Sequence, residues 1–158
     1  MGYARSLESG RGVIQAQVAI GGHALPWDDR SMFAELMLSW DIRSYRLAHQ
    51  SSGPVFFDRG LPDVVGYLRL VGLPVPAHVQ KAAEIYRYNH FVFVAPPWEE
   101  IYQSDVERKQ NFNEAVRTYQ SVTHVYKALN YELIEIPCVS VAERVRFVLE
   151  TVRTVLHS

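Results

Sequence analysis

The stretch Val55-Phe56-Phe57-Asp58-Arg59-Gly60 runs from three apolar residues directly into an acid, a base and a glycine. A short continuous apolar run of this kind predicts a strand that is buried on both faces, as in a parallel sheet. Gly53-Pro54 marks the start of the predicted strand, and Gly60-Leu61-Pro62 marks its end. Asp58 therefore follows the carboxyl end of a buried strand, which is the edge where open α/β sheets bind ligands.

Strands and helices alternate along the rest of the chain. Further strands are predicted at residues 3–7, 91–95 and 133–136, with segments of helical apolar spacing between them. This alternation predicts an α/β fold with a mainly parallel sheet covered by helices on both faces. The length of 158 residues predicts a single domain spanning residues 1–158.

Several helix ends can be read from single residues. Asp28 or Asp29 is placed to cap the helix that follows, and Asn130 is placed to end a later one. Ser140 and Glu143 have the spacing of a capping box at the start of the last helix. Helical spacing covers residues 13–20, 33–47, 62–70, 77–86, 115–129 and 141–156.

Composition limits the partners and the compartment. The net charge is −1, which gives no basis for binding a nucleic acid or a membrane surface. Cys138 is the single cysteine, so an intramolecular disulfide cannot form, and the first residues show no apolar signal region. No apolar run approaches the ~20 residues of a membrane span. We therefore expect a cytoplasmic protein with no nucleic-acid or membrane partner.

Asp58 and Arg59 form the first candidate site. The carboxylate of Asp58 has the chemistry to hold Mg²⁺, directly or through water, and the guanidinium of Arg59 has the geometry to bind phosphate in a bidentate manner. The alternative is structural: an acid that caps the following helix and pairs with the neighbouring base. Spacing alone leaves both interpretations open.

Glu8 follows the first predicted strand, so a parallel sheet would bring Glu8 and Asp58 to one carboxyl edge. Two carboxylates there can divide metal binding from substrate binding or base catalysis. On spacing alone, Glu8 and the nearby Arg11 are better explained as surface residues.

Residues 105–110 form a charge cluster. If this segment acts as a lid, Arg108 and Lys109 would close on phosphates. The alternative is that the segment is the solvated start of a helix.

A phosphate-binding glycine-rich loop is missing from the sequence. The pattern Gly-x-x-x-x-Gly-Lys-Ser/Thr would provide it, but none of Lys81, Lys109 and Lys127 follows a glycine.

The six histidines show no close pairing typical of a zinc site. Residues 87–89 precede the strand at 91–95, at its amino end, so we expect a structural role for them.

A set of short motifs is spread over nearly the whole chain, and these motifs are specific only in combination. With them, the chain resembles the AAA-domain predicted ATPases of bacteria, which are P-loop NTPases related to ribosylnicotinamide kinase domains and to nucleoside and nucleotide kinases. The motifs are Glu8-Ser9-Gly10-Arg11, Ala19-Ile20-Gly21-Gly22-His23-Ala24-Leu25-Pro26-Trp27, Phe33-Ala34-Glu35-Leu36-Met37, Phe56-Phe57-Asp58-Arg59-Gly60, Arg87-Tyr88-Asn89, Ala95-Pro96-Pro97-Trp98 and Asp105-x-Glu107-Arg108-Lys109-Gln110.

The resemblance implies a three-layer α/β/α sandwich around a mainly parallel sheet, with the family's first strand, P-loop and first helix missing. It implies ATP and Mg²⁺ as cofactors, an unknown small-molecule acceptor, and ATPase or phosphotransferase activity. The roles implied are Asp58 as the metal-side acid with Arg59 beside it in the catalytic set, Glu8 on the acceptor or base side, and Arg11, Arg108 and Lys109 in nucleotide binding.

The missing P-loop limits the activity that the resemblance implies. Phosphoryl transfer depends on positioning and charge stabilisation, so we expect weak or absent ATP hydrolysis from this chain alone. The alternative is a non-catalytic remnant that acts as a binding module or a homo-oligomer. In the family, the missing strand lies between those at residues 55–57 and 91–95, so its absence would expose sheet edges that can pair with another chain.

Overall fold

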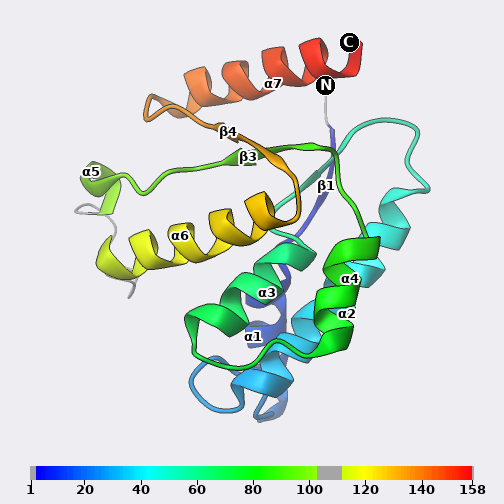
Figure 1. Cartoon of the computed structure of the whole chain (residues 1–158), viewed down its shortest axis with the longest axis vertical. Helices are drawn as coiled ribbons and strands as arrows, with labels where there is room; N and C mark the ends of the chain where they lie inside the picture. Colours follow the sequence, from blue (N-terminus) through cyan, green and yellow to red (C-terminus); the bar gives the residue numbers. More distant parts are fainter. Residues whose placement is uncertain (1–2, 103–111, 158) are drawn as a thin grey trace. The chain divides into compact units, whose positions relative to one another are not determined.

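The computed structural model describes residues 3–102 and 112–157, and Figure 1 shows their elements in chain order. The chain divides into two compact units, Met1–Tyr88 and Asn89–Ser158. Each unit contains one pair of short parallel strands with helices around it. Mixed α/β structure with parallel strand pairing is therefore confirmed in both units.

The first unit is organised around strands β1 (Ala4–Ser6) and β2 (Val55–Phe57). The two strands pair in parallel, with Ser6 opposite Phe57 at their carboxyl ends. This register brings the residues that follow each strand to one edge of the sheet, as the sequence predicted. That edge holds the candidate site.

Helices α1 (Ser9–Ile20) and α2 (Arg30–Ala48) connect the two strands. Gly21 ends α1 in the left-handed conformation, with φ of 67°, which glycine adopts without steric cost. Asp29 rather than Asp28 caps α2, because its Oδ1 accepts a hydrogen bond from the backbone amide of Met32 at 2.9 Å. The sequence left these two aspartates open as alternatives.

Helices α3 (Leu61–Leu70) and α4 (Ala77–Ile85) complete the first unit. Helix α2 packs on both α1 and α3, and α3 also packs on α4. Buried side chains from all four helices form the core, with the tightest burial in α3. The buried apolar residues include Val13, Phe33, Ala34, Met37, Leu38, Leu61, Val64, Val65, Leu68, Val79, Ala82 and Ala83.

The second unit contains strands β3 (Phe91–Val94) and β4 (Glu132–Glu135), which also pair in parallel. Its helices are α5 (Glu99–Tyr102), α6 (Phe112–Ala128) and α7 (Val141–His157), and α6 and α7 lie on opposite sides of the strand pair (Figure 1). Asn130 has a left-handed φ of 59° just after α6, and Ser140 and Glu143 form the capping box of α7. Both helix-end predictions are confirmed.

Two predictions about the elements are wrong. The strands at residues 55–57 and 91–94 are half-buried rather than buried on both faces, because each sheet in the described part of the chain has only two strands. Helix α1 begins at Ser9, four residues earlier than expected, because Ser9 and Gly10 pack into the core and extend the helix toward the sheet. Within residues 3–102 and 112–157, no helix is both long and apolar enough to span a membrane.

Candidate functional site

The carboxyl edge of the β1–β2 pair brings together residues from two distant parts of the sequence. Glu8 follows β1 as the N-cap residue of α1 and is half-buried. Asp58 and Arg59 follow β2 in the turn before α3, and both are exposed. The structure therefore places three of the predicted site residues at one edge.

Arg59 lies among the acids of this edge. Its Nη1 is 3.1 Å from Oδ1 of Asp63, and its side chain remains 48% exposed. Asp63 has the largest effect in raising the pKa of Arg59, burial opposes the rise, and Glu8 and Asp58 add to it. Arg59 is thus a fixed positive charge facing Glu8, Asp58 and Asp63.

Asp63, rather than Asp58, caps helix α3. Its Oδ2 accepts a hydrogen bond from the backbone amide of Gly60 at 3.0 Å, and its Oδ1 pairs with Arg59. The structural alternative for Asp58 is therefore wrong, because the cap and the ion pair both belong to another acid. Asp58 makes no side-chain hydrogen bond or ion pair with any residue that the structure describes, so its carboxylate remains open to solvent. An acid at the third position of a helix is a recognised capping signal that would have identified Asp63.

Tyr88 holds the turn that carries Asp58 and Arg59. Its hydroxyl accepts a hydrogen bond from the backbone amide of Leu61 at 3.2 Å, and its ring packs edge-on against Phe57 with centroids 4.9 Å apart. The expected structural role of residues 87–89 is thus supported by these contacts. Residues 87–89 lie at the amino end of β3 as predicted, and Tyr88 in addition contacts the turn at the carboxyl end of β2. No sequence pattern indicated this long-range contact.

Asp41 is a buried acid that the sequence analysis missed. It lies on α2, is 5% exposed, and its Oδ2 is buried without a hydrogen-bond partner among the described residues. Burial raises the pKa of Asp41 to about 7, Ser9 opposes this rise, and Asp63 and Glu8 contribute to it. The available signal was spacing, because Asp41 continues the buried face formed by Phe33 and Met37 at four-residue intervals.

No contact among the described residues brings the remaining predicted site residues to this edge. Arg11 is exposed on the first turn of α1, three residues after Glu8. Arg108 and Lys109 lie outside the residues that the structure describes, and so does the whole predicted lid at residues 105–110. Their roles in nucleotide binding stay predictions.

The residues at this edge fit the metal-binding part of a magnesium–nucleotide site, but they do not provide its phosphate-binding part. Mg²⁺ in such sites keeps several waters and is held by one or two carboxylates together with phosphates, so the open carboxylate of Asp58 suits it. In the described part of the chain, no three His, Cys, Asp or Glu side chains are grouped to hold a metal ion. The sequence also contains no glycine-rich phosphate loop. No step of phosphoryl transfer follows from these residues by themselves.

Comparison with known proteins identifies the family. A search of curated proteins and a search of solved structures gave no match. A sequence model of the family described as AAA domain matches residues 1–144, and this range includes every candidate site residue discussed above. The chain therefore belongs to the AAA domain family.

Proposed function

We propose that this chain contributes the metal-side and acceptor-side residues of an ATP site in a P-loop ATPase or small-molecule kinase-like protein. The observation that carries the proposal is the open carboxylate of Asp58 at the carboxyl edge that also holds Arg59 and Glu8. Membership of the AAA domain family supports nucleotide binding at such an edge. In this proposal Asp58 holds Mg²⁺, and Glu8 either binds the acceptor or acts as a general base.

The proposal extends to the finer expectations from the resemblance. These are a three-layer sandwich in a single domain, a relation to ribosylnicotinamide kinase domains and a cytoplasmic location. Arg11, Arg108 and Lys109 would contact the nucleotide. Because the 158 residues include no P-loop pattern, we expect this chain alone to bind ATP weakly and to hydrolyse it slowly or not at all.

Asp58→Asn should abolish the dependence of ATP binding on Mg²⁺. The unsubstituted chain should bind a fluorescent ATP analogue with a dissociation constant of about 0.1–1 mM, roughly fivefold tighter with Mg²⁺ than with a chelator. The Asp58→Asn chain should show equal affinity in both conditions, because the neutral amide no longer attracts the cation. Fluorescence titration with and without Mg²⁺ measures this ratio.

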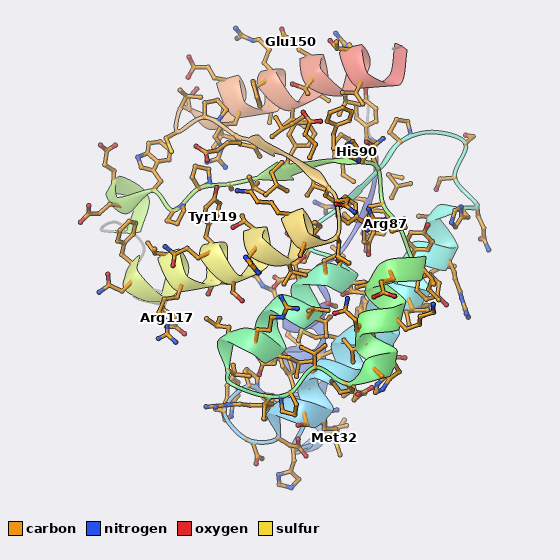
Figure 2. All side chains as sticks on the ribbon, in the orientation of Figure 1. Met32, Arg87, His90, Arg117, Tyr119 and Glu150 are labelled. Carbon is orange, nitrogen blue, oxygen red and sulfur yellow. The ribbon has the colours of Figure 1, made fainter. Side chains whose placement is uncertain are left out.

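Glu150→Gln is the matched control for this titration. Glu150 is an exposed carboxylate on α7 (Figure 2) and is not one of the proposed site residues, so the substitution removes one negative charge without changing any of them. Its Mg²⁺ dependence should equal that of the unsubstituted chain. The proposal fails if the unsubstituted chain shows no Mg²⁺ dependence, or if both substitutions change the ratio equally.

A second candidate function is an interaction module that assembles through its strand edges. The specific observation is that β2 pairs only with β1, and β3 only with β4, among the residues described. Two-stranded parallel sheets are rare in isolation, and an unpaired edge is a template for another strand. Sedimentation of the purified chain separates the two candidates, because the module should form concentration-dependent oligomers. A monodisperse monomer would contradict the oligomeric form of this second function.

A further inference from the structure

The turn that carries Asp58 and Arg59 contains a strained backbone conformation. Arg59 has a φ of 71°, in the left-handed region that residues with a Cβ atom rarely adopt. Such a conformation persists only where the surrounding structure holds it in place. Because the side chains of Asp58 and Arg59 both leave the backbone in this turn, the contacts that hold the turn also set their directions.

The turn is held by one residue of its own helix and by one distant residue. Asp63 accepts a hydrogen bond from the amide of Gly60 at 3.0 Å, and its own amide donates to the carbonyl of Gly60 at 2.9 Å. Tyr88 accepts a hydrogen bond from the amide of Leu61 at 3.2 Å, and its ring packs edge-on against Phe57. Contacts to Tyr88 therefore enclose the turn on both sides along the chain.

The segment at residues 86–88, here called the strap, is fixed on helix α2. Oη of Tyr45 donates a hydrogen bond to the backbone carbonyl of Arg87 at 2.8 Å. The ring of Tyr45 also packs edge-on against the rings of Tyr86 and Tyr88, with centroids 5.4 Å and 5.5 Å apart. The strap therefore links the position of the turn to that of α2.

The hydroxyl of Tyr88 has a role that ring packing alone does not require. The first amides of a helix have no partner within the helix, and Leu61 is the first residue of α3. Tyr88 supplies the missing acceptor from 27 positions away, whereas phenylalanine would supply the same ring without it. The hydroxyl therefore ties the start of α3, and with it the end of the turn, to the strap.

We infer that Tyr88 is a positioning residue: as the end of the strap, it keeps the backbone of Arg59 in its left-handed conformation and so directs the side chains of Asp58 and Arg59. This role rests on the proposed function only for the ligands that these two side chains would bind. The hold on the turn is a property of the chain without any nucleotide, so it can be measured separately.

Tyr88→Phe should raise amide hydrogen exchange at Gly60 and Asp63 by about tenfold, because the turn opens more often without the hydroxyl. NMR measures both rates. These two amides bond within the turn and not to Tyr88, so faster exchange there reports loosening of the turn itself. Tyr67→Phe is the matched control, since the hydroxyl of Tyr67 on α3 has no hydrogen-bond partner among the described residues. It should leave both rates within about twofold of those in the unsubstituted chain.

Tyr45→Phe tests the strap. This substitution removes the hydrogen bond to the carbonyl of Arg87 and keeps the ring that packs against Tyr88. It should raise exchange at Gly60 by about threefold or more. Combining it with Tyr88→Phe should add little, because both substitutions break the same link between α2 and the turn.

Two substitutions of Arg59 test the strained backbone. Arg59→Ala and Arg59→Gly both remove the guanidinium, but only glycine adopts a φ of 71° without steric cost. Adding Tyr88→Phe should therefore raise exchange at Gly60 by about tenfold in the Arg59→Ala chain and by less than about threefold in the Arg59→Gly chain.

A titration with the fluorescent ATP analogue connects the turn to the site. Tyr88→Phe should reduce the effect of Mg²⁺ on affinity from about fivefold to less than about twofold, because the carboxylate of Asp58 is no longer held in one direction. If the unsubstituted chain does not bind the analogue, the proposed function fails and the exchange measurements are unaffected. The two conclusions can therefore fail separately.

Four results would overturn the positioning role of Tyr88. The first two concern exchange in the Tyr88→Phe chain: an increase confined to Leu61, or an equal increase throughout α2 and α3. The third is an equal effect of Tyr88→Phe in the Arg59→Ala and Arg59→Gly chains. The fourth is an unchanged Mg²⁺ effect on affinity in a Tyr88→Phe chain whose turn has loosened.

Discussion

The unsubstituted chain should lose about 2–3 kcal/mol of its free energy of unfolding between about pH 5 and pH 8, and Asp41→Asn should abolish this loss. The loss arises because burial raises the pKa of Asp41 from 3.8 to about 7 in the folded chain. A neutral asparagine has no such titration. The substituted chain should therefore be the more stable one at pH 8, despite losing a native side chain.

The direction follows from the number of protons bound by each state. Between the unfolded pKa of 3.8 and the folded pKa of about 7, the folded chain keeps the proton on Asp41 and the unfolded chain does not. Stability therefore falls as pH rises through this window. Below the unfolded pKa both states are protonated and the stabilising contribution is complete. Above the folded pKa both are ionised and the contribution has been lost.

Urea unfolding of both chains across this pH range measures the effect. The difference between the two free energies isolates Asp41 from the other titratable groups, because these are the same in both chains. Glu150→Gln removes an exposed carboxylate on α7 and serves as the control, which should show no comparable pH-dependent gain. Parallel curves for the unsubstituted and Asp41→Asn chains would show that Asp41 is ionised at neutral pH in the folded protein.

Gly60→Ala should lower the free energy of unfolding by about 2 kcal/mol and displace the turn that carries Asp58 and Arg59. An alanine Cβ at this position would lie 2.8 Å from Cε2, Cζ and the hydroxyl oxygen of Tyr88. The ring has little freedom to retreat, because it packs against Phe57 and Tyr45 and its hydroxyl binds the amide of Leu61. The added methyl group therefore moves either the ring or the turn.

Gly53→Ala is the control for this substitution, because no atom lies within 4 Å of its Cβ position. It should change the free energy of unfolding by less than about 0.5 kcal/mol. Tyr88→Ala should be destabilising alone, but in combination with Gly60→Ala the two losses should not add, because the smaller side chain leaves room for the methyl group. Urea unfolding measures all four chains. Equal stability of Gly60→Ala and Gly53→Ala would rule out a close clamp by Tyr88.

Local patterns in the sequence predicted the elements well, because their causes lie within a few residues. Interactions between neighbouring residues determine three of these elements. They are the strand at residues 55–57, the helix end at Asn130 and the capping box of Ser140 and Glu143. The parallel register that brings Glu8 and Asp58 to one edge was also predictable, since it follows from the alternation of strands and helices.

The sequence by itself determined the α/β class, the positions of the strands and the placement of both Glu8 and Asp58 at one edge of the sheet. Only the tertiary structure decided which acids are engaged: Asp63 takes the cap and the ion pair, and Asp58 stays open. It also buried Asp41 on α2 and placed Tyr88 against Gly60. The physical reason is the separation along the chain. The burial of Asp41 and the contact between Gly60 and Tyr88, which are 28 positions apart, depend on how the helices pack and not on the neighbouring residues in the sequence.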